Sequence, residues 1–204
     1  MLLDEYLPTF DVRSKYAIRI AAAPERVFGL LRITDFDCWG IMRQLYALRT
    51  LASLFQMPQE TLHRFHEELR RERYTLNSML RNGLTLLGER AREELVLGAV
   101  GRFWRARGEL VPTSATKFHD PAPFGTAKLA WNFTVGLCKD GGTELRTETR
   151  VLCEDVPTCR LFRRYWMWTQ PFSGLIRLER LAAVRSAVER RPYPTVDPPF
   201  LMQL

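Results

Sequence analysis

The sequence lacks the features that mark a membrane protein, a secreted protein or a disulfide-stapled domain. No run approaches the roughly 18 to 20 uncharged apolar residues that a membrane span requires, because charges interrupt every candidate. The opening MLLDEYLPTF carries acidic residues and has neither the basic nor the apolar region of a secretory signal. The four cysteines form no CxxC pair. We therefore expect a soluble, cytoplasmic protein whose cysteines are packing residues.

Motifs of several enzyme classes are missing as well. The chain contains no GxSxG, P-loop, GxGxxG or HExxH motif, so hydrolase, kinase and Rossmann interpretations lose their main support. Only three histidines are present, and His63 and His66 stand three apart within HRFHEE. A metal there would need a distant third ligand, for which His119 is the candidate. We favour a solvated helix face for this pair and predict neither a metal nor a cofactor.

Basic residues are in excess, but they are dispersed. Lysine and arginine outnumber aspartate and glutamate by 30 to 23, which brings nucleic acid and anionic membranes into consideration as partners. The charges are interleaved, as in RFHEELRRER and TELRTETR, rather than gathered in one tract. RFWRAR and FRRYW place rings beside arginines, yet no nucleic-acid module accompanies them. We predict a solvated charged surface and no nucleic-acid partner.

The chain of 204 residues suits one domain, and its periodicity changes along its length. Alternation around Ile18 predicts a strand over Asp11 to Ala22. A helix should follow from Pro24, because proline is tolerated in the first turn of a helix. Helical spacing predicts two more helices, one over Ile41 to Phe55 and one from Pro58.

From Gly83 onward the pattern becomes β-rich and then helical again. GLTLLGER and EELVLGAVGRFW predict two strands, and AKLAWNFTVGLC and TELRTETRVLC predict two more. The section from Arg105 to Thr126 should be irregular or a short edge strand. Asp155 to Arg190 has helical spacing, and the proline-rich residues 191–204 should form an extended tail. The order indicates an α+β fold.

The last predicted hairpin determines which side chains share a face. A three-residue loop over Asp140 to Gly142 would place Trp131 opposite Val151 and Phe133 opposite Thr149. This register leaves two hydroxyls, those of Thr147 and Thr149, on an otherwise apolar face. Strand propensity explains threonine there as well as function does. A hydroxyl in an apolar interior needs a partner, and a ligand or water is one alternative.

The long last helix is predicted to turn an apolar line toward the sheet. Its members recur at helical spacing: Leu161, Tyr165, Trp168, Phe172 and Leu175, continued by Leu178, Ala182 and Val188. Pro171 cannot donate its backbone hydrogen bond and crowds the preceding turn, which predicts a bend within FRRYWMWTQPFSGLI.

The order of elements resembles the START-like superfamily, also called the helix-grip or SRPBCC fold, which includes polyketide cyclase/dehydrase proteins. The resemblance covers roughly residues 10 to 190 and rests on the strand leading into APERVF, the glycine-rich hairpin followed by TELRTETRV, and FRRYWMWTQPFSGLI. The chain is most similar to uncharacterised bacterial members. The resemblance implies a curved antiparallel sheet wrapped around a long C-terminal helix in one domain over 1–190, with an enlarged helical insertion over about 39–74.

The resemblance also implies a hydrophobic cavity between the sheet and the last helix, which would bind a lipid, a sterol-like or a polycyclic aromatic molecule without covalent chemistry. The expected ligand-binding residues are Trp104, Trp131, Phe133, Thr147, Thr149, Tyr165, Trp168 and Phe172. It carries over no catalytic residue.

Alternatives remain open at this point. One is a cyclase or aromatase-type enzyme using the same cavity, with acid–base chemistry from Tyr165, His119 or Arg102. Another is a structural or partner-binding module with a filled core, since tryptophans serve core packing as well as ligand contact. The helix over Ile41 to Phe55 would allow transient contact with a membrane surface, although packing over the cavity mouth is favoured. Both a monomer and a homodimer are compatible with the sequence.

Overall fold

The computed structural model describes residues 1–36, 75–105, 109–139 and 141–190, and for residues 171, 172 and 190 it describes the backbone only. The helices predicted within residues 41–74, the insertion, the pair His63 and His66, and the proline-rich tail all lie outside the described residues. Within the described part, no helix combines the length and the hydropathy that crossing a bilayer requires.

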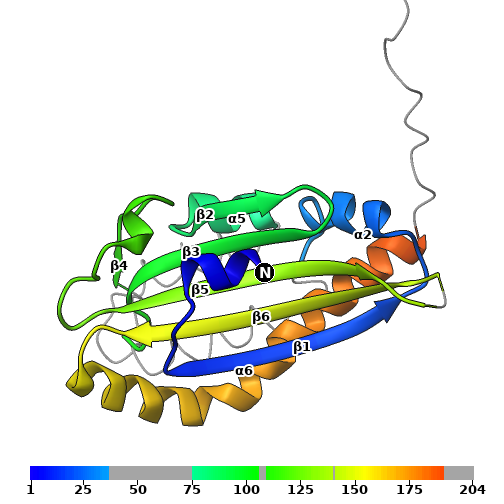
Figure 1. Cartoon of the computed structure of the whole chain (residues 1–204). Coiled ribbons are helices and arrows are strands. Elements are labelled where there is room, and N and C mark those ends of the chain that lie inside the picture. The colour runs from blue at the N-terminus through cyan, green and yellow to red at the C-terminus, as the bar shows by residue number, and fades with distance from the viewer. Residues whose placement is uncertain (37–74, 106–108, 140, 191–204) are drawn as a thin grey trace, which may run out of the picture.

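The described chain forms an α+β fold built on one antiparallel sheet of six strands, with the order β1-β6-β5-β3-β2 and β4 paired to β3 (Figure 1). The strands are β1 (Val12–Ile20), β2 (Thr85–Arg90), β3 (Glu94–Arg102), β4 (Glu109–Val111), β5 (Ala127–Leu137) and β6 (Thr143–Cys153). The four long β-runs and the first strand were predicted at these places. β4 is the short edge strand expected between residues 105 and 126.

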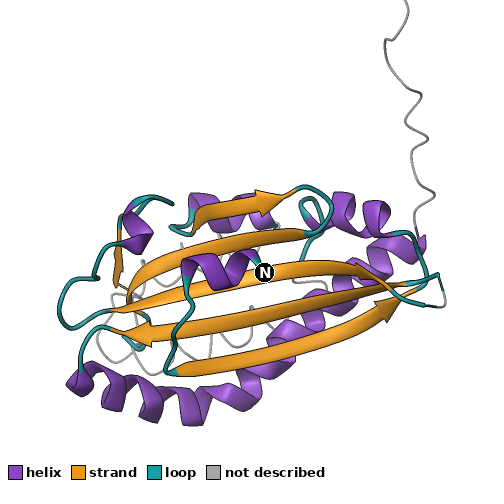
Figure 2. Cartoon of the chain, in the orientation of Figure 1, coloured by secondary structure: helices purple, strands orange, loops and turns teal. Residues whose placement is uncertain are grey.

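Helices lie on both faces of this sheet, as Figure 2 shows. They are α1 (Leu2–Tyr6), α2 (Pro24–Leu31), α5 (Leu76–Arg81), the short 3₁₀ helix η2 (Lys117–His119) and α6 (Val156–Arg190). α6 contacts β1, β6 and α2 on what we call the inner face, whereas α1 contacts β2, β3 and β5 on the outer face. α2 begins with Pro24 in its first turn, as predicted, while α1 and α5 were not predicted.

The two faces carry separate cores. The inner core joins strand residues such as Leu95, Phe133 and Leu145 to Leu181 and Val184 of α6. The outer core is smaller and holds α1 and η2 against β2, β3 and β5. Alternation along each strand sorts the side chains between these cores, because successive residues point to opposite faces.

The β5–β6 register differs from the predicted one by two residues. Trp131 lies opposite Thr149 and Phe133 opposite Thr147. The Cys138 N–H donates to the Gly142 carbonyl at 2.7 Å, so the hairpin closes one residue earlier than expected. Gly141 takes the left-handed conformation (φ 84°) that the end of such a loop requires. Two adjacent glycines satisfy that requirement equally in the sequence, and a shift of two preserves the predicted faces.

α6 runs unbroken through 35 residues, and its ribbon changes direction about half-way along (Figure 1). A bend was predicted at Pro171. The orientation predicted for the helix is wrong, however. Leu161, Leu175 and Leu178 of the predicted line are exposed, whereas Phe162, Arg177, Leu181 and Val184, which lie off it, are buried. Val188, at the end of the predicted line, is buried as expected. The true buried line includes a charge and small residues, which a hydropathy criterion discounts.

Candidate functional site

Polar side chains meet aromatic rings where the middle of α6 crosses β1 and β6. We call this group the inner-face site. Its members are Tyr16 on β1, Trp131 on β5, Thr147 and Thr149 on β6, and Trp166, Ser173 and Arg177 on α6. Alternation along the strands fixes the first four on one face, and helical spacing brings Trp166, Ser173 and Arg177 onto the side of α6 that meets it.

Gly174 allows α6 to approach β1 closely at this point. A Cβ at position 174 would lie 2.7 Å from the Tyr16 hydroxyl oxygen and 3.3 Å from its ring. Any larger residue would push the tyrosine or the helix away. The glycine therefore sets the spacing at which Tyr16 and the neighbouring Ser173 and Arg177 share one space.

The Thr147 hydroxyl is fully used by the protein. It accepts a hydrogen bond from the Trp131 indole N–H at 2.6 Å and donates to the Asn132 carbonyl at 2.7 Å. The buried hydroxyl of Thr147 therefore has its hydrogen-bond partners within the protein, and one of them is a tryptophan on the neighbouring strand. It also fixes the orientation of the Trp131 ring, which lies 4.7 Å from that of Phe133.

The Thr149 hydroxyl has a different partner, the guanidinium of Arg177. Arg177 Nε donates to Thr149 Oγ1 at 3.2 Å, and one terminal nitrogen donates to both the carbonyl and the hydroxyl of Ser173. The guanidinium carbon lies 6.0 Å from the Tyr16 ring centroid and 5.6 Å from that of Trp166. These rings supply cation–π attraction on two sides.

Arg177 is a buried cation, with 8% of its side chain area exposed. No carboxylate of a described residue lies within ion-pair distance of it. Burial lowers the pKa of Arg177 to about 10, and the positive charge of Arg180 adds to the decrease. The group still carries its proton at neutral pH, so a positive charge stays in the interior.

Aromatic rings extend from Arg177 in both directions along α6. Trp166 lies 5.8 Å from Phe162, which meets Trp104 edge to face at 6.0 Å. On the other side, the Arg180 guanidinium lies 4.6 Å from the Trp131 ring centroid. The result is a band of rings with positive charge at its centre.

The structure brings together four of the eight residues named from the sequence. Trp131, Phe133, Thr147 and Thr149 share the inner face. Trp104 and Tyr165 are half-buried and gather around Phe162 at the end of the sheet, next to the site rather than in it. The side chain of Phe172 lies outside the described residues.

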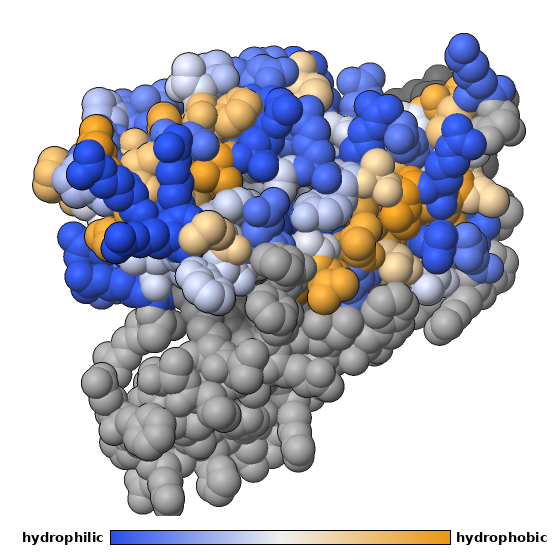
Figure 3. Space-filling model, turned by 90° about the horizontal axis from the view of Figure 1, so that it is seen from below, coloured by the Kyte–Doolittle hydropathy of each residue, from blue (hydrophilic) through white to orange (hydrophobic). Residues whose placement is uncertain are grey.

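Trp168 is the clear exception. Its side chain is 78% exposed, so the prediction that it faces the sheet is wrong. It belongs to the exposed line of α6 with Leu175 and Leu178. Figure 3 shows the molecule from below, where hydrophobic and hydrophilic residues are interspersed on the described surface. The buried residues of α6 lie about one position further along the sequence than those predicted to face the sheet.

Sequence reasoning missed Tyr16, Trp166, Ser173 and Arg177 as site residues. The available signal was spacing. One line of residues at helical spacing runs along this helix: Phe162, Trp166, Ser173, Arg177, Leu181, Val184 and Val188. An arginine within such a mostly apolar line is unusual, because charged side chains normally lie on the exposed face of a helix.

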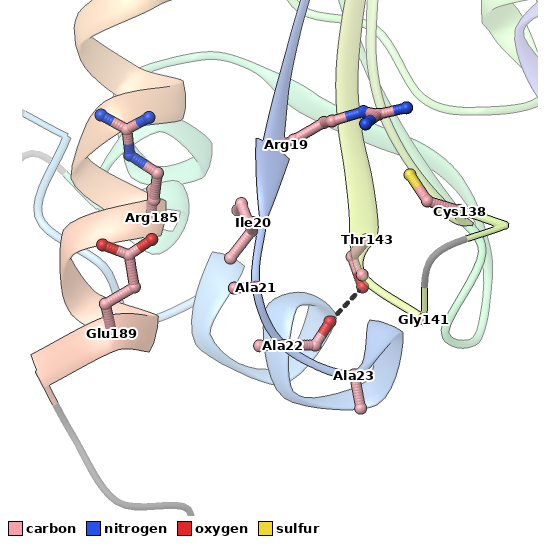
Figure 4. A pocket seen from close by; sticks show the side chains of 11 residues that line it. Arg19, Ile20, Ala21, Ala22, Ala23, Cys138, Gly141, Thr143, Arg185 and Glu189 are labelled. Carbon is pink, nitrogen blue, oxygen red and sulfur yellow. Dashed lines mark hydrogen bonds between the residues drawn. The ribbon is translucent and has the colours of Figure 1, made fainter.

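An open pocket of about 520 Å³ lies elsewhere, where the end of β1 meets the β5–β6 hairpin and the last turns of α6. Figure 4 shows Arg185 and Glu189 of α6 on one side and Ala22 and Thr143 on the other. The Thr143 hydroxyl already donates to the Ala22 carbonyl, and the described residues that line the pocket include no aromatic one. A second pocket of about 320 Å³ opens beside Met1 and Arg146. Neither is lined by Arg177.

Cys153, Cys159 and Asp11 bring three potential metal-ligand atoms within 4.8 Å of one another. Burial raises the pKa of both thiols, which keeps them protonated and poor as ligands. The Asp11 carboxylate already accepts the Cys153 N–H at 2.9 Å and lies 3.6 Å from Arg163. We interpret the group as packing and assign no metal to it.

The residues considered for acid–base chemistry do not converge. His119 is exposed on η2, with its ring stacked on Tyr6 of α1 at 5.2 Å. Arg102 donates to Glu109 and to the Gly125 carbonyl near the edge of the sheet.

No protein-family model matches the chain, and a search of curated proteins finds no significant relative.

Proposed function

We propose that this chain binds a small, largely apolar ligand non-covalently between the inner face of the sheet and α6, as a carrier or sensor. In the same proposal the chain is a START-like, helix-grip domain. The binding residues are those of the inner-face site, flanked by Phe133 and Trp104. Lipids, sterol-like molecules and polycyclic aromatic molecules are the ligand classes that the site suits.

The observation that carries the proposal is the position of Arg177. A protein interior selected for stability alone would not contain a cation without a counter-charge. Burying such a charge costs several kcal/mol, which is comparable to the whole free energy of unfolding of a domain. Here the cation lies between two aromatic rings, those of Tyr16 and Trp166, and donates to Thr149 and Ser173. Ligand sites have this composition, in which apolar walls surround a few convergent polar groups.

The binding energy would come mainly from apolar burial. Contact with the rings of Trp131 and Trp166 removes apolar surface from water at about 25 cal/mol per Å². The polar groups of the site would orient the ligand rather than supply most of its affinity. No acid–base pair is assembled there among the described residues, which favours binding over catalysis.

A neutral fluorescent probe tests this proposal. N-phenyl-1-naphthylamine should bind saturably, with one site per chain and increased emission. Ser173→Phe, which places a ring beside Arg177, should weaken binding by about tenfold or more, because a filled site excludes the probe's rings. Gln170→Phe is the matched control, since Gln170 is exposed on the same helix.

Absence of saturable probe binding would contradict the proposal and favour a module with a filled core. So would equal affinity in the wild type and in a folded Ser173→Phe variant. Thermal unfolding of both variants shows whether each is folded.

A further inference from the structure

The inner-face site has more hydrogen-bond donors than acceptors. Arg177 uses its Nε and one terminal nitrogen on Thr149 and Ser173, and among the described residues its second terminal nitrogen has no acceptor. The Thr149 hydroxyl accepts from Arg177, so its own hydrogen is left to donate. The Tyr16 hydroxyl likewise has no acceptor in the described part.

We propose that the ligand is an acid whose anionic oxygens pair with Arg177 and accept from the hydroxyls of Thr149 and Tyr16. This inference rests on the proposed function, since it names the chemical class of the molecule bound at the same site. The shared chemistry is a carboxylate, sulfonate or phosphate monoester at one end of an apolar body.

The charge balance of the site supports an acid rather than a neutral ligand. Arg177 contributes a buried positive charge for which no described residue supplies a carboxylate within ion-pair distance. Hydrogen bonds between a guanidinium and an anion are about twice as strong as neutral ones, and a shielded site strengthens them further. An anion would relieve the cost of the buried charge, whereas an alcohol or an amine would leave it in place.

The shape of the site also defines where the acid lies. Thr149 and Ser173 hold the guanidinium from two sides, and the rings of Tyr16 and Trp166 flank it. A fixed guanidinium loses little side-chain entropy when it binds an anion. The apolar body would then lie along the band of rings toward Phe162 or toward Trp131.

Two probes that share one ring system test the inference. N-phenyl-1-naphthylamine is neutral, and 1-anilinonaphthalene-8-sulfonate adds a single anionic group to the same skeleton. We expect the wild-type protein to bind the sulfonate about tenfold more tightly or better, as a charge-assisted hydrogen bond would give. In Arg177→Met the ratio of the two dissociation constants should fall to about one.

Arg164→Met is the matched control, because Arg164 is exposed on the same helix. Both dissociation constants should be unchanged in this variant. Arg177→Lys keeps the charge and should keep a preference for the sulfonate, which excludes a general loss of structure as the cause in Arg177→Met.

In a second arm, hexadecanoic acid, hexadecyl phosphate and hexadecan-1-ol compete with the sulfonate probe. One of the two acids should displace it at a concentration about tenfold below that of the alcohol, and which acid does so identifies the source. An alcohol as effective as both acids overturns the inference, as does a folded Arg177→Met variant that keeps the preference. If the neutral probe binds while the sulfonate binds no better, the acid is excluded and the proposed function stands. If neither probe binds, both fail.

Discussion

At the scale of single residues, Arg177 combines burial, positive charge and neutral partners. Its hydrogen bonds go to two hydroxyls and a helix carbonyl, none of which balances its charge. We expect a cation in that position to contribute little to the stability of the ligand-free protein. In the proposed function its role is to bind a ligand, which would separate it from the charges on the outer face.

A stability measurement separates these roles. Arg177→Met keeps most of the side-chain length and removes the buried charge. We expect the free energy of unfolding of the ligand-free protein to stay within about 1 kcal/mol of the wild type or to increase, because no paired charge is left unbalanced. Urea unfolding followed by circular dichroism measures this. A loss of about 3 kcal/mol or more would show that Arg177 is structural.

Thr147 should behave in the opposite way. Thr147→Val keeps the shape but leaves the buried Trp131 indole N–H without its acceptor. The expected cost is about 1 to 3 kcal/mol, which is typical of an unsatisfied buried donor. Thr134→Val on the half-buried outer side of β5 is the control and should change stability by less than about 0.5 kcal/mol. Equal effects in the two variants would contradict this role for Thr147.

At the scale of elements, the start of α6 depends on Asp155. Its carboxylate accepts from the Thr158 N–H, the Thr158 hydroxyl and the Gly125 N–H, each at 2.8 Å. This cap also ties the helix to the segment before β5, so it helps to position the whole of α6 under the sheet.

The hydrogen bonds from Thr158, the backbone N–H first, lower the pKa of Asp155. A carboxyl group whose pKa is lowered by folding stabilises the folded state at pH values above its unfolded pKa of about 3.9. That contribution is lost as the pH falls through the pKa of the group in the folded state. Asp155→Asn should therefore lower the unfolding midpoint at neutral pH and flatten its dependence on pH below about 4. Thermal melts at several pH values measure both. Glu93→Gln, in the exposed β2–β3 turn, should leave the profile unchanged.

α1 is held to the outer face by buried polar contacts. The Glu94 carboxylate accepts from the Leu2 N–H at 2.6 Å, the Leu3 N–H at 3.1 Å and the Asn132 side chain at 2.7 Å. Arg150 adds ion pairs with Asp4 and with Glu148, at 2.7 Å each. The short helix therefore depends on strand residues for its N-terminal hydrogen bonds.

Glu94→Gln should detach α1 more easily, since it removes the charge from these hydrogen bonds and leaves one side-chain donor facing another. We expect a loss of about 1 to 3 kcal/mol together with faster amide exchange in residues 2–7. Glu144→Gln on β6, whose partner Arg146 is exposed, is the control. Unchanged exchange in α1 would show that its apolar contacts suffice.

At the scale of the whole molecule, strand positions could be predicted from the sequence because alternation is a local signal. Tyr16, Ile18 and Ile20 alternate on β1, and the faces of β5 and β6 follow from the same rule. The hairpin register could not be predicted, because Gly141 and Gly142 are equivalent candidates for the left-handed position. α1 has five residues, too few for a periodic pattern.

The site was predicted in part for the same physical reasons. Inward strand residues such as Trp131 and Thr149 follow from alternation. The orientation of α6 does not follow from alternation. The line of α6 that faces the sheet contains Ser173, Gly174 and Arg177, although the line that contains Trp168 and Leu175 is more apolar. Contacts between α6 and the strands decide this orientation, and they are long-range in the sequence.

The identity of a bound molecule tests the central proposal most directly. Native mass spectrometry of protein purified from cells under mild conditions, repeated after incubation with a lipid extract of those cells, measures what the chain holds. We predict a one-to-one complex with a small apolar molecule that is released on denaturation and is depleted in Ser173→Phe but not in Gln170→Phe. A folded wild-type chain that carries no small molecule in either preparation would contradict ligand binding at the inner-face site.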